Sequence, residues 1–151
     1  MRVLYRIFLH QPQSTLILAL NLRDILTPEE FFYHVFESLP RQGPGCPGAT
    51  RKAYSYLPLP SKDLTVLDIG CGTGSQTRIL AELTDGTISG VDNHVPFHRS
   101  SNGMGEKKGL DKRLRALPAS MDSLPFEKQE FDLIWSEGAI FIIGFLEGLK
   151  A

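Results

Sequence analysis

Hydrophobic residues in the first third of the chain recur at helical spacing. The run Thr27–Glu30 offers a capping residue, a proline at the first helical position and a glutamate three residues after the threonine, which predicts a helix start. Apolar side chains then repeat every three to four positions, and Pro40 predicts the end of the helix. We expect this apolar stripe to pack in a core; it consists of Phe31, Phe32, Val35, Phe36 and Leu39.

The segments on either side of this helix are less regular. Glycines and prolines in Arg41–Gly48 exclude regular structure and predict an ordered loop or a lid, followed by a second helix from about Ala49 to Leu57. The apolar run Leu16–Leu20 is too short to span a bilayer, and no small-residue cleavage site follows it. We therefore interpret residues 1–26 as an N-terminal extension.

From Leu64 onward the apolar positions form short runs that alternate with amphipathic segments. Leu64–Ile69 is typical of a buried central strand, Ser75–Leu83 of a helix, and Thr87–Val91 of a second strand. Weaker strand patterns occur at Leu114–Ala119 and Phe131–Trp135, the latter followed by the apolar segment Ile140–Leu149. This alternation predicts an α/β fold with a Rossmann-like, open, mostly parallel sheet of about four strands and flanking helices.

These patterns divide the chain at two places. After the extension 1–26 comes a partial domain, 27–151, made of N-terminal helices and a loop (27–62) and a cofactor-binding βαβ core (63–151). One segment departs from the alternation, since the glycines and serines of Pro96–Gly109 disfavour the crossover helix expected between strands two and three.

Composition limits the classes of partner. With 42% hydrophobic residues, 22% charged residues and a net charge of −1, no overall field attracts nucleic acid or an acidic membrane. Cys46 and Cys71 lie far apart without metal-type spacing, which indicates reduced thiols in a cytoplasmic protein. His94 and His98 have no third ligand at metal spacing, so we expect no metal.

The strongest chemical signal is Asp68-Ile-Gly-Cys-Gly-Thr-Gly74, where a buried strand turns into a helix. Glycines allow a tight turn and let a ligand approach the backbone, and the positive end of the following helix favours an anion such as a carboxylate. Asp92 ends the next strand 92 − 70 = 22 positions after the first glycine, close to the spacing at which an acidic side chain meets ribose hydroxyls. The two strand ends predict one nucleoside site.

The spacing Gly-x-Gly-x-Gly resembles motif I of class I S-adenosylmethionine-dependent methyltransferases and differs from the Gly-x-Gly-x-x-Gly of dinucleotide enzymes. The resemblance implies S-adenosyl-L-methionine as the cofactor. It assigns the ribose to Asp92, with Asn93 beside it. It assigns the methionine part to Asp68, Gly70, Cys71, Gly72 and Gly74.

Two later segments extend the resemblance. Ala119–Phe126 is similar to the family's loop after strand three, which implies that Met121 and Asp122 flank the adenine, although Asp122 also suits an ordinary turn. Phe131–Gly138 is similar to the fourth-strand motif, which implies Ser136 at the cofactor and Glu137 at the substrate. An acid such as Glu137 is equally favoured in the first turn of a helix. The resemblance names no catalytic base, so the catalytic residues stay unknown.

The resemblance covers about Glu29–Leu149 and is closest to the type 11 group, whose members act on small molecules, as in ubiquinone and menaquinone biosynthesis. It implies a small-molecule methyl acceptor, with neither nucleic acid nor membrane as partner. Class I relatives continue after strand four, in the strand order three, two, one, four, five, seven, six. We therefore expect a truncated domain of marginal stability and weak cofactor binding, whose fourth strand is an exposed edge open to self-association.

Two other functions stay open at this stage. One is a nicotinamide-nucleotide-binding oxidoreductase fragment, against which the glycine spacing and the Met121-Asp122 element both argue. The other is a non-catalytic product of a truncated gene, which the irregular segment Pro96–Gly109 favours.

Overall fold

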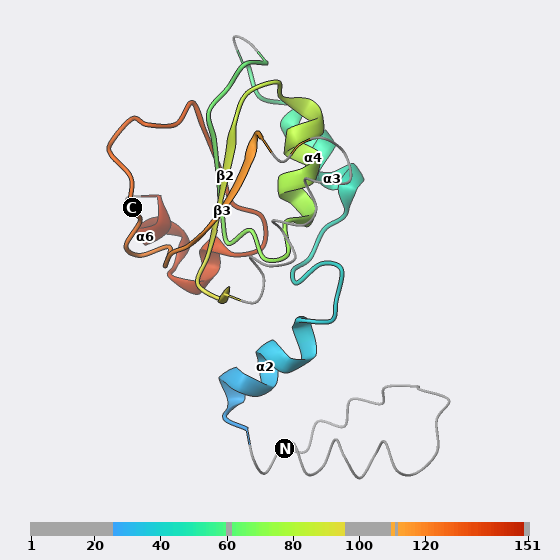
Figure 1. The fold of residues 1–151 in the computed structure, drawn as a ribbon, viewed down its shortest axis with the longest axis vertical. Helices are drawn as coiled ribbons and strands as arrows, with labels where there is room; N and C mark the ends of the chain where they lie inside the picture. The colour runs from blue at the N-terminus through green and yellow to red at the C-terminus, as the bar shows by residue number, and fades with distance from the viewer. Residues whose placement is uncertain (1–25, 60–61, 96–109, 111, 150–151) are drawn as a thin grey trace. The chain divides into compact units, whose positions relative to one another are not determined.

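The computed structural model describes residues 26–59, 62–95, 110 and 112–149 (Figure 1). The chain forms two compact units, with the boundary between Phe36 and Glu37. The segment Pro96–Gly109 lies outside the described residues, and so does His98 within it. The expectations of an irregular crossover and of a His98 that binds no metal fall on this segment.

Helix α2 (Pro28–Phe36) is the described element of the first unit, and it begins where the capping pattern predicts. The backbone N–H of Thr27 donates to Glu30 Oε2 at 2.7 Å, and the N–H of Glu30 donates to Thr27 Oγ1 at 3.2 Å, so both halves of the capping box are formed. The expectation that its apolar stripe packs in a core is wrong, since no residue of α2 is buried in the structure. Phe32 instead stacks on Phe36 of the same helix, with ring centroids 4.2 Å apart.

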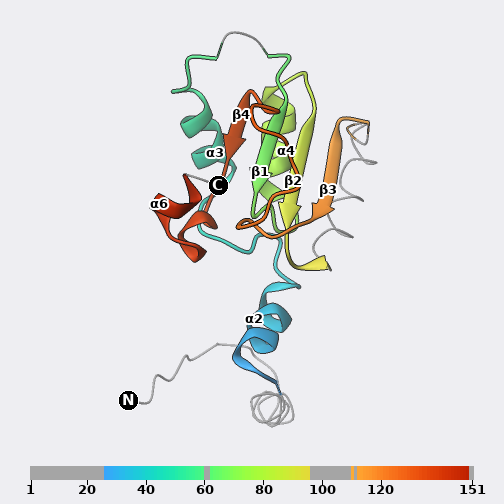
Figure 2. The same ribbon diagram turned by 90° about the vertical axis from the view of Figure 1, so that its left-hand side faces the viewer.

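The second unit is built on a four-stranded parallel sheet, as Figure 2 shows. Its strands stand in the order β3-β2-β1-β4, which confirms the predicted α/β fold. All neighbouring pairs are parallel; three strands lie within their predicted runs, and β2 ends one residue beyond its run. The strands are β1 (Val66–Ile69), β2 (Ile88–Asp92), β3 (Leu114–Pro118) and β4 (Leu133–Trp135).

Helices α3 (Pro47–Tyr54) and α4 (Ser75–Leu83) pack together on one face of this sheet (Figure 1). The bounds of α4 are those predicted, whereas α3 begins two residues inside the expected loop and ends at Tyr54. Proline at the first helical position explains the earlier start, because its missing N–H would have had no intrahelical partner. The 3-10 helix η1 (Ile140–Ile142) and helix α6 (Phe145–Gly148) follow β4 on the other side of the sheet.

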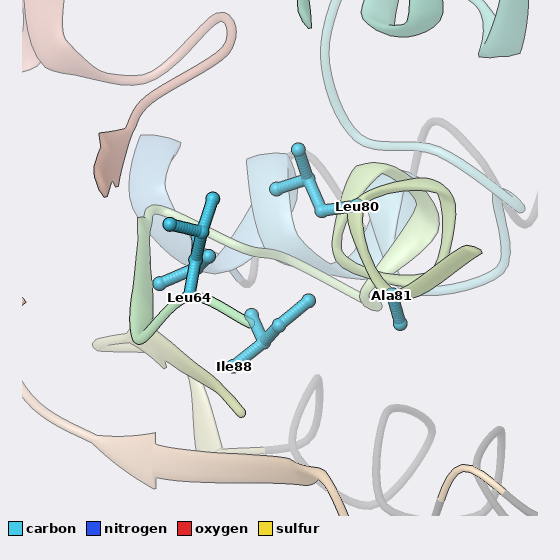
Figure 3. Packing of buried hydrophobic residues seen from close by; sticks show 5 residues of the cluster. Leu64, Leu80, Ala81 and Ile88 are labelled. Atoms are coloured by element: carbon cyan, nitrogen blue, oxygen red, sulfur yellow. The ribbon is translucent and has the colours of Figure 1, made fainter. Parts of the chain in front are cut away.

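The core lies on both faces of β1, whose four residues are all buried. Figure 3 shows the cluster on the α4 side, which consists of Leu64, Val66, Leu80, Ala81 and Ile88. The opposite face holds Leu67, Ile69 and Val91, with Met121 among the partly buried side chains packed on them. Burial on both faces fixes the ends of β1 and β2, and the predicted site follows these ends directly.

Within the described residues, no helix combines the length and the apolar composition needed to cross a bilayer. The same residues include no group of three or more His, Cys, Asp or Glu side chains arranged to hold a metal ion.

Candidate functional site

The glycine-rich bend between β1 and α4 has the backbone that its composition requires. Gly70, Gly72 and Gly74 have φ of 71°, 54° and 81°, in the left-handed region that favours glycine. A β-carbon at Gly70 would collide with the Cβ of Ala139, and one at Gly72 would lie 2.7 Å from Gln42 Oε1. Side chains from elsewhere in the chain therefore pack directly on the bend, at distances that only glycine permits.

Asp92, at the end of β2, lies against this bend. Its Oδ2 accepts a hydrogen bond from Gly72 N at 2.9 Å, and its Oδ1 accepts one from His94 N, also at 2.9 Å. The neighbouring Asn93 is exposed. A carboxylate can accept up to about four hydrogen bonds, and sugar hydroxyls are among the donors that suit it.

Asp68 is fully buried on β1, directly before the bend. Its Oδ2 accepts a hydrogen bond from Thr77 Oγ1 at 2.5 Å, whereas Oδ1 has no partner among the described residues. Burial raises the pKa of Asp68 to about 7, against the lowering effect of the nearby polar side chains of Thr77 and Gln76. Burial thus disfavours the charged form of this carboxyl group, which retains one oxygen for a donor.

Cys71 has a packing role. Its side chain is buried, and burial together with the nearby carboxylates of Asp68 and Asp92 raises the pKa of the thiol well above its usual value. A β-carbon at Gly90 would lie 3.0 Å from the sulfur, so the thiol fills the space beside β2. A neutral, buried thiol is a poor nucleophile, and nothing here gives Cys71 a chemical role.

The two residues assigned to the adenine differ in environment. Met121 is half-buried against the Leu67, Ile69 and Val91 cluster, and its Cε lies 3.7 Å from the position that a β-carbon on Gly70 would take. It therefore reaches the bend. Asp122 is exposed in a tight turn, a position that suits both an ordinary turn residue and a contact with the adenine.

The end of β4 joins the site through Ser136 and Glu137. Ser136 Oγ donates to the carbonyl of Ile69 at 3.1 Å and so ties the end of β4 to the end of β1. Glu137 is not in the first turn of a helix, since the next helical element, η1, begins at Ile140.

Both oxygens of the Glu137 carboxylate accept hydrogen bonds. Oε1 accepts from Arg41 Nη2 at 2.7 Å, and Oε2 accepts from Thr50 Oγ1 at 2.8 Å and from Trp135 Nε1 at 3.3 Å. The side chains of Arg41 and Glu137 are only 14% and 18% exposed, and Thr50 is fully buried. Glu137 therefore fastens two preceding segments of the chain to β4.

Residues 37–44, which we call the strap, contact the ends of three neighbouring strands. Glu37 Oε1 lies 2.6 Å from His94 Nε2 after β2, and Arg41 binds Glu137 after β4. Gln42 Oε1 accepts from Thr73 N at 2.9 Å and from Thr73 Oγ1 at 2.8 Å, in the bend after β1.

The sequence indicates an ordered loop or lid at Arg41–Gly48 but not the partners of Arg41 and Gln42. These partners lie 96 and 31 positions away, and no local pattern marks such contacts. The buried hydroxyls that complete the site were missed for the same reason; they belong to Thr50 and Thr77.

Comparison with known proteins identifies the family. The family described as "Methyltransferase domain" matches residues 66–146, more than half of the 151-residue chain. The chain belongs to this methyltransferase family. The matched region of the methyltransferase domain runs from β1 to α6, so it includes the bend, Asp92 and the end of β4.

Relatives of the domain are methyltransferases of small molecules by name. Sterol 24-C-methyltransferase of Pneumocystis carinii is 33% identical over 85 residues, covering 56% of this chain and 22% of that protein. Sarcosine/dimethylglycine N-methyltransferase of Aphanothece halophytica is 28% identical over 79 residues, covering 52% of this chain and 28% of that protein. The chain thus spans about a quarter of the length of these relatives.

A solved structure shares the fold. Geranyl diphosphate C-methyltransferase from Streptomyces coelicolor, crystallised with Mg²⁺, geranyl diphosphate and S-adenosyl-L-homocysteine, superposes with a TM-score of 0.56. The two chains are 20% identical, and the match covers 62% of this chain and 36% of that one. The class I methyltransferase fold predicted from the motifs is thereby confirmed.

Proposed function

We propose that this domain binds S-adenosyl-L-methionine at the ends of β1 and β2 and transfers its methyl group to a small-molecule acceptor. The observation that carries the proposal is the hydrogen bond from Gly72 N to Asp92 Oδ2, which joins the glycine bend and the acid of the next strand. A nucleoside whose sugar meets Asp92 would place its substituent along the bend. Family membership and the methyl-transfer activities named for the relatives support the same function.

The residues present fit this cofactor. The unpartnered Oδ1 of Asp68, at the start of the bend, suits a donor such as an amino group. We assign the ribose to Asp92 and an adenine contact to Met121, which lies half-buried beside the bend. When bound, the cofactor supplies an electrophilic methyl group on a sulfonium, which leaves as a neutral thioether.

The protein's contribution to such a reaction is alignment. Holding an acceptor in line with a methyl group lowers the barrier by up to about 7–11 kcal/mol in favourable cases. The protein therefore needs no catalytic base when the acceptor is already nucleophilic. We assign Ser136 to the alignment of the β1 and β4 ends, since it bonds the Ile69 carbonyl. We assign Glu137 a positioning role, because both its oxygens already accept hydrogen bonds from the protein.

Calorimetric titration of the full chain with S-adenosyl-L-homocysteine tests the cofactor assignment. Asp92→Asn keeps the shape of the side chain but removes its charge and one acceptor, so we expect an affinity about tenfold weaker, or about 1.4 kcal/mol. Asp85→Asn is the matched control, because Asp85 is exposed at the turn after α4. A folded wild-type chain that ignores the ligand at millimolar excess would refute the proposal.

The two other functions have distinct readouts. Titration with NADH tests whether the chain binds a nicotinamide nucleotide, which membership of a methyltransferase family disfavours. Transfer of labelled methyl to hydroxyl, amine and thiol acceptors tests catalysis, and binding of S-adenosyl-L-homocysteine without any transfer would favour a non-catalytic product.

We further propose that the chain associates with itself through the β4 edge. Among the described residues β4 pairs only with β1, and Ile134 on it is 62% exposed. Sedimentation velocity should show a concentration-dependent oligomer that Ile134→Lys abolishes and that Tyr56→Lys, an exposed control, leaves intact. We retain the cytoplasm as the proposed location, because the thiols of Cys46 and Cys71 are both free.

A further inference from the structure

Every backbone N–H of the glycine bend already has an acceptor. Three of the five donate to backbone carbonyls and so belong to the fold itself: Gly70 N and Cys71 N to Val91 O, and Gly74 N to Cys71 O. The other two donate to side chains, Gly72 N to Asp92 and Thr73 N to Gln42. A ligand that accepts hydrogen bonds from this bend must therefore displace one of these two side chains.

Gln42 is the more readily displaced of the two. It is neutral and is held on the strap by a hydrogen bond from Nε2 to the Leu39 carbonyl at 2.6 Å, whereas Asp92 carries a charge that would repel an anionic ligand. The amide oxygen of Gln42 also fills the space that the missing β-carbon of Gly72 leaves, 2.7 Å from where that atom would stand. Its amide oxygen therefore accepts from both the N–H and the hydroxyl of Thr73 and also occupies the space beside the backbone of Gly72.

We propose that Gln42 is a competitor for the carboxylate of the cofactor, in whose place its amide oxygen holds the N–H and hydroxyl of Thr73. This inference rests on the proposed function, and it adds a residue that tunes affinity for the amino-acid end of the cofactor. A carboxylate is the stronger acceptor for these donors, which stand at the N-terminal end of the nine-residue helix α4. Cofactor binding then releases Gln42 from the bend.

The inference predicts a selective gain in affinity. Gln42→Ala removes the competing oxygen, so S-adenosyl-L-homocysteine should bind about tenfold more tightly, which corresponds to about 1.4 kcal/mol. 5′-Methylthioadenosine has the same nucleoside but lacks the amino-acid end, so its affinity should stay unchanged. Gln42→Glu should have the opposite effect, because its carboxylate would hold the Thr73 donors more strongly and weaken binding of S-adenosyl-L-homocysteine alone.

Calorimetric titration of both ligands into each variant carries the test. Gln42→Met keeps the length of the side chain without its amide oxygen, so it should behave as Gln42→Ala does even if the alanine variant unfolds. Gln129→Ala is the matched control, because Gln129 lies on an exposed turn outside the site. Equal changes for both ligands, or weaker binding of S-adenosyl-L-homocysteine by Gln42→Met, would overturn the inference. Failure of the wild-type chain to bind either ligand would instead refute the proposed function.

Discussion

Replacing Glu137 with glutamine tests the ion pair that ties the strap to the sheet. The substitution keeps the size of the side chain but removes the charge that faces Arg41 Nη2 at 2.7 Å. It also forces the new amide to present its N–H₂ group either to the donor of Arg41 or to those of Thr50 and Trp135. At least one of these donors then loses its acceptor.

The loss of unfolding free energy expected for Glu137→Gln lies between the values for an exposed and a fully buried ion pair. Exposed ion pairs contribute about 0–1 kcal/mol, whereas breaking a fully buried pair costs about 3–5 kcal/mol. Arg41 and Glu137 are 14% and 18% exposed, and Arg41 keeps hydrogen bonds to the carbonyls of Gly43 and Pro44. We therefore expect Glu137→Gln to lower the free energy of unfolding by about 2 kcal/mol.

Urea unfolding followed by circular dichroism measures this cost. Glu82→Gln is the matched control, because Glu82 pairs with an Arg51 whose side chain is 45% exposed, so its loss should cost less than about 1 kcal/mol. The transition midpoint should fall while the slope stays constant, since the surface exposed on unfolding is unchanged. If the two variants lose equal stability, the strap is not held by this pair.

Three further predictions concern single residues of the core and the bend. Gly70→Ala should destabilise the chain by about 2–4 kcal/mol in urea unfolding, because the added β-carbon collides with Ala139 and the left-handed backbone strains an alanine. Gly144→Ala has the same backbone strain but open space around it, so it should cost about 1–2 kcal/mol. Burial raises the pKa of Asp68 to about 7, so between about pH 4 and 7 the folded chain holds a proton that the unfolded chain has lost. The contribution of Asp68 to stability therefore falls as pH rises through this window, by at most about 1.4 kcal/mol per pH unit. Asp68→Asn should flatten the pH dependence of the urea midpoint. An unchanged pH dependence would contradict the raised pKa. Iodoacetamide should modify the exposed Cys46 of the folded chain and spare the buried Cys71, so mass spectrometry should find one adduct at pH 8; rapid double labelling would refute the packing of Cys71.

Elements whose causes are local were predicted well. The capping box at Thr27 and the bounds of α4 follow from neighbouring residues, and the strands follow from short apolar runs. The wrong predictions concern features that depend on contacts with distant parts of the chain or on a residue type that suits two structures. The stripe on α2 has helical period, but period alone does not say whether another element covers it. At Pro47 a proline was read as a loop signal although it also suits a helix start.

The site was predictable in part for the same reason. The bend and Asp92 were found because strand ends on one edge of a parallel sheet must lie together. The contacts of Arg41 and Gln42 depend on how the strap crosses this edge, which no spacing in the sequence encodes. Asp122 matches the motif in sequence and lies in an exposed turn, so its assignment to the adenine stays a prediction.

Two glycines interlock the strap region with the loop after β4. A β-carbon at Gly138, which has φ of 75°, would lie 2.9 Å from Pro44 Cδ. One at Gly45, which has φ of 111°, would lie 2.5 Å from Glu137 Oε1. Neither loop can therefore accept a larger residue unless the other yields. Among homologues of this protein, substitutions in one loop should therefore be accompanied by substitutions in the other, although about 90 positions of sequence separate the two loops.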